Sequence, residues 1–430
     1  MSASGPSGEM VIVGGGAGGV ELAAALGRRS VGSKTRVTLV DCATRHLWKP
    51  RLHEVAAGLI GAGEDESSYL ALAQANNFRF RLGALTSLDP ANRTISISSV
   101  KDSEGRAFLD ERRLQYDTLV LAFGSQVNDF GVPGVAEHCH MLDSGEQALA
   151  FQHRVLEQAV RVADGALERL RIGIVGAGAT GVELAAELHH AIGAMHRFGG
   201  LMPVEGLDIT VVDMAARVLP NCDPATSKFA AEALERLGVR IRLNAGVERV
   251  TADGLILKGG ETVPCAVKVW ASGVIGWPFA SSLAGVQVDR SRRIVCDDHL
   301  RCAGVDGVYA LGDCACVLDQ KTQRPLPATA QVAHQQAAYL TRALRSPSKD
   351  PGPFAYKPRG TLVSLGREPA AGEVPVADRS QIILHGRLPK LLYVSLHLMH
   401  RIELIGWSRA LTLLLADRLR RIMAPPVKLH

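Results

Sequence analysis

The stretch Met10–Leu26, MVIVGGGAGGVELAAAL, decides the fold, because Ile172–Leu188 repeats it without a gap as IGIVGAGATGVELAAEL. Each copy reads as a short apolar strand, a glycine-rich turn and a helix rich in alanine and leucine. In this unit the pyrophosphate of a dinucleotide binds against the free N–H groups at the start of the helix. Two copies therefore predict an α/β protein with two doubly wound, Rossmann-like dinucleotide-binding domains.

The glycines of each turn have three different tasks. The first permits a tight turn, the second lets the backbone approach a pyrophosphate, and the third lets the helix pack closely on the strand. These positions are Gly14, Gly16 and Gly19 in the first copy and Gly176, Gly178 and Gly181 in the second. A single turn of this kind is weak evidence, and ordinary glycine-rich turns are the alternative. Two copies in the same strand and helix context predict two cofactor sites.

An acidic residue ends the next apolar strand of each copy. Asp41 follows Val37–Val40, and Asp213 follows Ile209–Val212. A carboxylate at this place accepts hydrogen bonds from ribose hydroxyls and repels the 2′-phosphate of NADP. At the second site we therefore expect NADH rather than NADPH. Arg217 is close enough in sequence to soften that repulsion, although a solvated or helix-edge arginine is the simpler interpretation.

The composition is that of a soluble globular protein of two or three domains. The chain has 430 residues, 47% of them hydrophobic and 21% charged, with a net charge of +5. Met1–Met10 lacks the basic and apolar regions of a secretory signal, and no apolar run approaches the roughly 20 residues that cross a bilayer. We expect a cytosolic or membrane-peripheral protein, and nothing in the sequence points to nucleic acid.

The eight cysteines are scattered, and reduced thiols are expected in a chain without a signal. Only Cys314 and Cys316 are close neighbours, and a single C-x-C pair is a poor metal signature. We expect no metal, and metal binding or reduction at this pair stays a weaker alternative. Cys42 directly follows Asp41, but no second cysteine comes before Cys139, which argues against the redox cysteine pair of disulfide reductases.

The order of the segments resembles that of flavoprotein reductases of the glutathione-reductase type. Val305–Ala315, VDGVYALGDCA, resembles the Gly-Asp strand that returns to the first domain in that family, and Tyr116–Gly124 and Val267–Gly273 resemble its connecting strands. The resemblance implies that the first copy binds FAD and the second binds the nicotinamide nucleotide. It also implies that Gly124 and Asp313 complete the FAD site; a turn or capping aspartate is the alternative for Asp313.

The same resemblance implies a division of the chain into domains. Residues 1–125 and 291–346 form the FAD-binding domain, residues 126–290 form the NAD(H)-binding domain, and residues 347–430 form a C-terminal module.

Five segments, in order over nearly the whole chain, resemble the type II NADH dehydrogenases, especially those of the enterobacterial type. They are HLWKPRLHEVAAG (His46–Gly58), YDTLVLAFGSQVNDFGVPGV (Tyr116–Val135), GAGATGVELAAELHHA (Gly176–Ala191), ALGDCA (Ala310–Ala315) and AQVAHQQA (Ala330–Ala337), and the final VKLH (Val427–His430) matches as well. The resemblance implies a respiratory flavoenzyme that passes a hydride from NADH to FAD, and then two electrons and two protons to a membrane quinone, without proton pumping. A reductase for a small redox protein and an NADH sensor without turnover are the rivals.

This family resemblance also assigns a quinone site. Ala330, Gln331 and Gln335 match the pattern AQxAxQ that the family uses there, and glutamine amides can donate hydrogen bonds to quinone carbonyls. A polar stripe on a helix surface is the alternative. His334, in the same segment, could relay a proton or could be an ordinary helix residue.

Two further residues are assigned to the flavin environment by resemblance. In the family the glutamate at the place of Glu183 faces the nicotinamide and the flavin and is a proton-handling group. The alternative is a favourable acid in the first helical turn, since Glu21 has the same place in the first copy. Lys49 lies in a loop that lines the flavin in the family, where a cation could stabilise the anionic reduced flavin. It could equally be surface charge.

The C-terminal segment is both basic and apolar. A proline-rich linker, Pro347–Pro358, precedes it, and basic residues recur from residue 387 on: Arg387, Lys390, Arg401, Arg409, Arg418, Arg420, Arg421 and Lys428. Trp407, Leu411, Leu415 and Ile422 recur at helical spacing, although Arg418 falls within that stripe. This pattern indicates a helix in the membrane interface, and therefore a peripheral protein on the cytoplasmic face of the inner membrane. A helix packed on the protein's own core or on a second subunit of a homodimer is the alternative. Deletion of residues 404–430 is expected to release the protein to the soluble fraction.

Overall fold

The structure is a computed structural model. It describes residues 8–28, 30, 35–61, 63, 66–199, 202–346, 348–366, 368–375 and 381–423. The VKLH segment, Val427–His430, lies outside the described residues.

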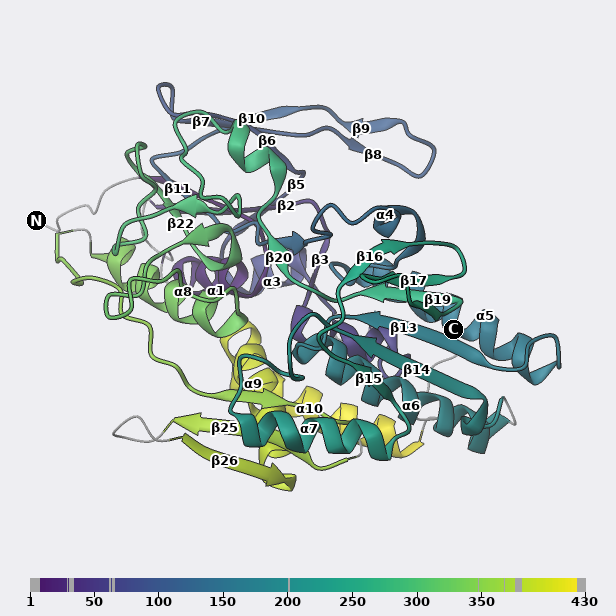
Figure 1. Cartoon of the computed structure of the whole chain (residues 1–430). Coiled ribbons are helices and arrows are strands. Elements are labelled where there is room, and N and C mark those ends of the chain that lie inside the picture. Colours follow the sequence, from purple (N-terminus) through teal and green to yellow (C-terminus); the bar gives the residue numbers. More distant parts are fainter. Residues whose placement is uncertain are drawn as a thin grey trace, which may run out of the picture.

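The first half is built on a five-stranded parallel sheet in the order β22-β11-β1-β2-β5. These strands are β1 (Glu9–Val13), β2 (Arg36–Asp41), β5 (Arg79–Leu82), β11 (Thr118–Leu121) and β22 (Val308–Ala310). The central strands are runs of buried apolar residues, because helices cover both faces of a parallel sheet. The helices are α1 (Ala17–Gly27), α3 (Tyr69–Asn76) and α8 (Ala330–Arg345). The strand β22 enters this sheet after the whole second half, which confirms the expected returning segment (Figure 1).

The second half repeats the design with a parallel sheet in the order β15-β14-β13-β19. Its strands are β13 (Leu170–Val175), β14 (Leu207–Val212), β15 (Arg240–Arg242) and β19 (Val267–Trp270), and its helices are α5 (Gly145–Ala163), α6 (Ala179–Gly199) and α7 (Pro224–Arg236). The expected strand, turn and helix units are therefore confirmed in both copies.

The internal repeat extends beyond the stretch that reveals it. A three-stranded antiparallel sheet comes directly before β11 in the first half and directly before β19 in the second. The first is β6-β7-β10 and the second is β16-β17-β18. Their strands are β6 (Leu85–Asp89), β7 (Thr94–Ile97), β10 (Arg112–Gln115), β16 (Val247–Val250), β17 (Gly254–Leu257) and β18 (Thr262–Pro264). The two connections between the halves pair with each other, since β12 (Gln126–Val127) is antiparallel to β20 (Val274–Ile275).

Short elements complete the two halves. They are β3 (Arg45–Leu47), η1 (Lys49–Arg51), α2 (Leu52–Ala56), β4 (Glu66–Ser68), β8 (Val100–Lys101), β9 (Ala107–Leu109), α4 (Val135–His138), η2 (Val204–Gly206), η3 (Pro278–Ser282), β21 (Ile294–Val295), η4 (Gly312–Cys314) and β23 (Ala315–Cys316).

The C-terminal module is a three-stranded antiparallel sheet followed by two helices. Its elements are β24 (Thr361–Val363), β25 (Ala370–Pro375), β26 (Gln381–Gly386), α9 (Arg387–Ile405) and α10 (Trp407–Met423). The chain changes direction between the helices at Gly406, whose φ of 81° is a conformation that glycine adopts without strain. Figure 1 shows the yellow helices α9 and α10 beside the strands β25 and β26 along one side of the molecule. None of the helices in the described part of the chain has the length and apolar character needed to cross a membrane.

Candidate functional site

The first glycine turn has the geometry that a pyrophosphate site needs. Gly14 has a φ of 104° and lies directly against the backbone of Ala122, so a side chain there would clash. Gly19 lies against the carbonyl of Gly14, which brings α1 close to β1. A Cβ added at Gly16 would meet nothing within 4 Å. The second glycine therefore borders open space at the N-terminus of α1, where an anion is favoured.

The second glycine turn has the same arrangement. Gly176 has a φ of 116° and lies against the backbone of Ala271, while Gly181 lies against the carbonyl of Gly176. A Cβ at Gly178 would again meet nothing within 4 Å. The chain thus forms two open cradles for a pyrophosphate, one in each half.

Asp41 and Asp213, the two acids expected to bind ribose, accept equivalent hydrogen bonds in the two halves. Asp41 Oδ2 accepts a hydrogen bond of 2.6 Å from the N–H of Gly15, and Asp41 Oδ1 accepts one of 2.7 Å from Ala43. In the second half Asp213 Oδ2 and Oδ1 accept bonds of 2.6 and 2.7 Å from Ala177 and Ala215. Both carboxylates are thereby fixed at the ends of their strands, next to the glycine turns.

The guanidinium of Arg217 is engaged near the second acid. It donates hydrogen bonds of 2.6 and 2.7 Å to the carbonyls of Cys222 and Pro220. Arg217 therefore stabilises its own loop, which agrees with the simpler of the two interpretations of this residue.

In the first half, the charge of Lys49 acts on two carboxyl groups, those of Asp41 and Asp313. Asp313 lies in η4, and Ser125 donates a hydrogen bond of 3.0 Å to its Oδ2. Burial raises the pKa values of Asp41 and Asp313, and the positive charge of Lys49 counteracts both shifts. Lys49 is therefore close to both carboxylates. The residues assigned to the FAD site from sequence, with Gly124 at a φ of 71° and open to space, lie together at this edge of the sheet.

Glu183 lies in the second turn of its helix, because α6 begins at Ala179. The expectation that it lies in the first turn was wrong, and so the helix dipole is not the reason for this acid, since the dipole acts within the first turn. Its side chain is buried, and Oε1 accepts a hydrogen bond of 2.9 Å from the N–H of Ser364. Burial raises the pKa of Glu183 well above its usual value, which favours the protonated carboxyl.

His53 is the neighbour of Glu183 on α2. Its Nδ1 lies 3.5 Å from Glu183 Oε2. Burial lowers the pKa of His53 to about 4, so the imidazole is neutral at neutral pH. Its Nε2 is buried and has no hydrogen-bond partner among the described residues. A carboxyl group with a raised pKa on α6 and a neutral imidazole on α2 thus lie side by side.

Glu21 is the counterpart of Glu183 in the first half, and its pKa is shifted in the opposite direction. Its carboxylate accepts hydrogen bonds of 2.7 Å from His334 and 2.6 Å from His400. Burial alone would raise the pKa of Glu21, but the two histidines outweigh it and hold the pKa at about 2. Glu21 is therefore ionised.

The two glutamines on α8 bind the segment that follows that helix. Gln331 Oε1 accepts hydrogen bonds from the Tyr356 hydroxyl at 2.6 Å and from the N–H of Arg359 at 2.8 Å, and its Nε2 donates to Gly360. Gln335 makes a pair of hydrogen bonds with the backbone of Lys357, at 2.8 and 3.0 Å. Each amide still has one further N–H with which it can donate.

Sequence reasoning missed four residues of this region. Gln336 is buried, and its Oε1 accepts a hydrogen bond of 2.7 Å from Gly312, next to Asp313. His46 and His53 belong to a segment that the sequence singled out, but only Lys49 was selected from it. His400 had no local signal at all, because its partners lie hundreds of residues away.

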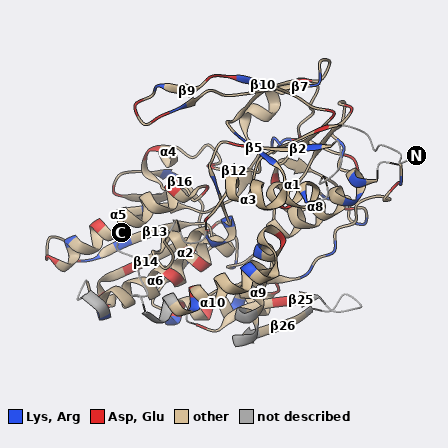
Figure 2. Cartoon of the chain, turned by 180° about the vertical axis from the view of Figure 1, so that it is seen from behind, with Lys and Arg blue, Asp and Glu red and all other residues tan. Residues whose placement is uncertain are grey.

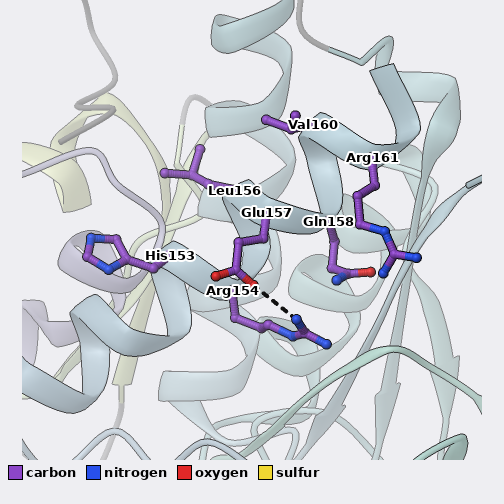
Figure 3. A pocket seen from close by; sticks show the side chains of 7 residues that line it. All are labelled: His153, Arg154, Leu156, Glu157, Gln158, Val160 and Arg161. Carbon is purple, nitrogen blue, oxygen red and sulfur yellow. Dashed lines mark hydrogen bonds and ion pairs between the residues drawn. The ribbon is translucent and has the colours of Figure 1, made fainter. Parts of the chain in front are cut away.

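Other surface and thiol features do not add to the site. Figure 3 shows a hollow lined by side chains of α5 alone, from His153 to Arg161, with an Arg154–Glu157 ion pair of 3.0 Å. It contains no residue assigned from sequence. In the described part of the chain, no group of three His, Cys, Asp or Glu residues is arranged to hold a metal. Cys314 is buried, and burial raises the pKa of its thiol to about 12.

The sequence matches known proteins over most of its length. The family model for pyridine nucleotide-disulphide oxidoreductases matches residues 8–337. The chain is 35% identical to a type II NADH:quinone oxidoreductase of Haemophilus influenzae, over 98% of this chain and 99% of that protein. It is 30% identical to the type II NADH:quinone oxidoreductase NdhA of Mycobacterium tuberculosis, over 96% of this chain and 87% of that protein.

Solved structures share the fold. The structure of NDH2 from Plasmodium falciparum in complex with NADH superposes with a TM-score of 0.82 at 17% identity, covering 98% of this chain and 100% of that one. The sulfide:quinone oxidoreductase of Aquifex aeolicus gives a TM-score of 0.72 at 18% identity, covering 97% of this chain and 95% of that one.

Proposed function

The chain belongs to the type II NADH:quinone oxidoreductases, within the pyridine nucleotide-disulphide oxidoreductase family, and from this membership we propose how its residues perform the reaction. The enzyme uses FAD to oxidise NADH and to reduce a quinone, and it does not pump protons. When bound, FAD supplies the redox chemistry, accepting a hydride and releasing two electrons. The protein supplies binding, orientation and control of protons.

The first half binds FAD in this proposal. Gly14, Gly16 and Gly19 hold the pyrophosphate, and Asp41 binds the adenosine ribose. Gly124 and Asp313 complete the site, and Lys49 offsets the negative charge of the cofactor. The open cradle at Gly16, with a lysine near both carboxylates, supports this assignment. The domain boundaries at residues 125, 290 and 346 are part of the same proposal.

The second half binds NADH through Gly176, Gly178, Gly181 and Asp213. The fixed carboxylate of Asp213 suits a free 2′-hydroxyl and repels a 2′-phosphate. Arg217 does not offset this repulsion, because its guanidinium is bound to backbone carbonyls. We expect NADH to be preferred over NADPH, and equal catalytic efficiency with both would contradict this assignment.

Glu183 is the proton-handling group in this proposal. Burial raises its pKa and so favours the protonated carboxyl, and the neutral His53 beside it can exchange a proton with it. A group that holds a proton away from water can release it when a reduced quinone forms.

The quinone binds along α8 at Ala330, Gln331 and Gln335. The second turn of this helix lies beside η4, because the Gln336 side chain accepts a hydrogen bond from the N–H of Gly312. The free amide N–H of each glutamine can donate to a quinone carbonyl. The rival assignment is structural, in which both amides serve only to hold residues 356–360.

The C-terminal module attaches the enzyme to the membrane in this proposal. The apolar side chains exposed on its helices are Val394, Leu396, Met399, Trp407, Leu411, Leu413, Leu415 and Leu419. Figure 2 shows Lys and Arg positions along α9 and α10, which can bind anionic lipid headgroups. A peripheral position on the cytoplasmic face of the inner membrane follows, and a homodimer through the same helices is the rival.

Anaerobic stopped-flow absorbance tests the assignment one half-reaction at a time. NADH is added to the FAD-loaded protein and bleaching is recorded, and a short-tailed ubiquinone is then added and recovery is recorded. Gly178→Ala should slow bleaching at limiting NADH by about tenfold or more and leave recovery unchanged, because the added methyl fills the second cradle. Gln335→Ala should slow recovery and leave bleaching unchanged.

The outcomes separate the rivals. His153→Gln, on the outer face of α5, is the control and should change neither step. If Gln335→Ala and Gln331→Ala both recover at the rate of the unsubstituted protein, α8 is not the quinone site. If the unsubstituted protein bleaches but never recovers, the acceptor is a protein or the chain is an NADH sensor.

A further inference from the structure

A chain of buried hydrogen bonds joins the C-terminal helix α9 to the first glycine turn. His400 on α9 binds Glu21 on α1 through Nδ1, at 2.6 Å. Its Nε2 lies 2.8 Å from Nε2 of His46 on β3. The Nδ1 of His46 lies 2.8 Å from the carbonyl oxygen of Gly15, which is the residue between Gly14 and Gly16 in the first glycine turn. All three side chains are buried.

The acceptors at the two ends fix the direction of these bonds. The carbonyl of Gly15 can only accept, so Nδ1 of His46 carries a proton. The Tyr69 hydroxyl donates to the same carbonyl at 2.7 Å, which occupies its second lone pair. The carboxylate of Glu21 accepts from Nδ1 of His400. A hydrogen bond between the two Nε2 atoms then needs one of them to donate to the other.

Neighbouring groups hold the pair in place. The ring of Trp48 lies over His400, with 4.0 Å between the ring centroids. The two rings are tilted by 34° relative to each other, so the indole packs against the imidazole. His334 on α8 occupies the other oxygen of Glu21 at 2.7 Å. The rotamers of both histidines are therefore determined by contacts from several elements.

The carbonyl of Gly15 belongs to the same peptide group as the N–H of Gly16. Because a trans peptide is planar, these two bonds point in opposite directions. Two donors that hold the carbonyl of Gly15 therefore also aim the N–H of Gly16. Gly16 is the residue that borders the open cradle. The preceding peptide is fixed as well, since the N–H of Gly15 donates to Asp41.

We propose that His400 is a positioning residue of the FAD site: through His46 and the Gly15 carbonyl, the C-terminal module orients the Gly16 N–H toward the pyrophosphate. The inference rests on the proposed binding of FAD at the first turn. It gives the C-terminal module a role in cofactor binding that is separate from any contact with lipid or quinone. The tightness of FAD binding is then determined partly by a residue far from the turn in sequence.

Two amide substitutions separate the two bonds that His400 makes. The amide nitrogen of asparagine takes the place of Nδ1, and that of glutamine takes the place of Nε2. His400→Asn thus keeps the bond to Glu21 and loses the bond to His46, whereas His400→Gln does the reverse. His400→Ala loses both. Each variant is made in the full-length chain, is deflavinated, and is titrated with FAD, and the ³¹P NMR spectrum of the bound pyrophosphate is recorded.

The bond to His46 should govern the result. We expect His400→Gln to bind FAD within about threefold of the unsubstituted protein, and His400→Asn and His400→Ala to bind it about tenfold more weakly, with shifted ³¹P resonances. Tyr69→Phe removes the other donor to the same carbonyl and should shift the resonances too. His153→Gln should change neither the affinity nor the spectrum.

Several results would overturn the inference. One is a His400→Asn variant that matches His400→Gln in affinity and in the ³¹P spectrum. Another is an equal loss of affinity in all three variants with an unshifted spectrum, which would indicate general docking of α9. If the His400 variants do not fold, an unshifted spectrum in Tyr69→Phe would contradict the role of the carbonyl. Absence of FAD binding in the unsubstituted protein would instead defeat the proposed site.

Discussion

Glu21 and Glu183 have the same position in the two repeats and are both buried, yet the pKa of Glu21 is lowered to about 2 and the pKa of Glu183 is raised well above its usual value. The difference comes from the neighbours that α8 and the C-terminal module place beside them. Glu21 receives two imidazoles, one of them from α9. Glu183 accepts a hydrogen bond from the N–H of Ser364 and lies close to Glu187, whose negative charge disfavours ionisation. One duplicated residue is thus a fixed charge in the first half, and in the second half it is the proton-handling group of the proposed mechanism.

Glu183→Gln tests the proposed proton-handling role of Glu183. Because its pKa is raised, Glu183 keeps its proton to a higher pH than an ordinary glutamate does, and it loses this proton as the pH rises through the raised pKa. Turnover of the unsubstituted enzyme should therefore decline on the alkaline side. The Gln variant keeps the acceptor for Ser364 but has no proton to give, so kcat with quinone should fall by about a hundredfold and lose this alkaline limb.

The kcat with quinone is measured for the FAD-loaded variant and the unsubstituted enzyme between about pH 6 and 10. Glu187→Gln, on the next turn of the same helix, should keep the alkaline limb but move it to lower pH, because the negative charge of Glu187 helps to raise the pKa of Glu183. An unchanged kcat in Glu183→Gln would leave Glu183 with a structural role only.

Among the elements, those defined by local signals could be predicted from the sequence. The strands that end at Asp41 and Asp213 were expected from apolar runs and terminal acids, and they occur where expected. The bonds that complete the site could not be predicted in the same way. His400 and Glu21 meet across most of the chain, and the amides of Gln331 and Gln335 bind a segment that has no regular pattern. Periodicity reports which face of an element is apolar, and it contains no information on which distant side chain meets it.

The helix α10 presents its apolar stripe outward. Trp407, Leu411 and Leu415, which the sequence placed on that stripe, are 72%, 45% and 57% exposed. The side chain of Ile422, the fourth member, lies outside the described side chains. By contrast Leu404, where the expected deletion would begin, is buried, and its carbonyl accepts a hydrogen bond from Asn76. Deletion from residue 404 would therefore disturb the core, and substitution is the sharper test.

The triple substitution of Leu411, Leu415 and Leu419 by serine should weaken membrane binding. The three side chains are at least 45% exposed, so their loss removes apolar area without opening the core. Binding to vesicles of phosphatidylglycerol should fall by at least about tenfold, since each buried leucine contributes on the order of 1.5–3 kcal/mol. Sedimentation with vesicles measures it.

Phe108→Ser, which removes an exposed apolar side chain from β9, is the control and should bind vesicles normally. Size-exclusion chromatography without lipid tests the rival. A triple variant that turns from dimer to monomer and keeps its vesicle binding would identify α10 as a subunit interface.

At the scale of the whole molecule, the C-terminal module fastens the two halves to each other. Its strands contact the second half, where Glu373 accepts a hydrogen bond of 2.6 Å from the N–H of Asp223. Its helix α9 contacts the first half at Asn76 and at Glu21. Glu21 lies on α1 and accepts hydrogen bonds from α8 and α9, so it joins three helices. Its ionisation should therefore affect the stability of the entire fold.

Glu21→Gln measures that contribution. Folding lowers the pKa of Glu21 from 4.5 to about 2, which corresponds to roughly 3 kcal/mol of stability. Because the folded pKa is the lower one, this stability is fully present above pH 4.5 and is lost as the pH falls through about 2. The free energy of unfolding in urea should be lower in the variant at neutral pH, and the difference should shrink below pH 4.5. Glu104→Gln, at an exposed site, should show no difference at any pH, and a gap in Glu21→Gln that stays constant with pH would contradict the linkage.

The position of β22 beside β11 has a consequence for synthesis on the ribosome. About 190 residues separate these neighbouring strands, and at 5–20 residues per second a ribosome needs on the order of 10–40 s to make them. The second half is contiguous in sequence and can close during that time. The half that begins first is thus completed last, and the edge of β11 stays unpaired on the nascent chain until β22 emerges.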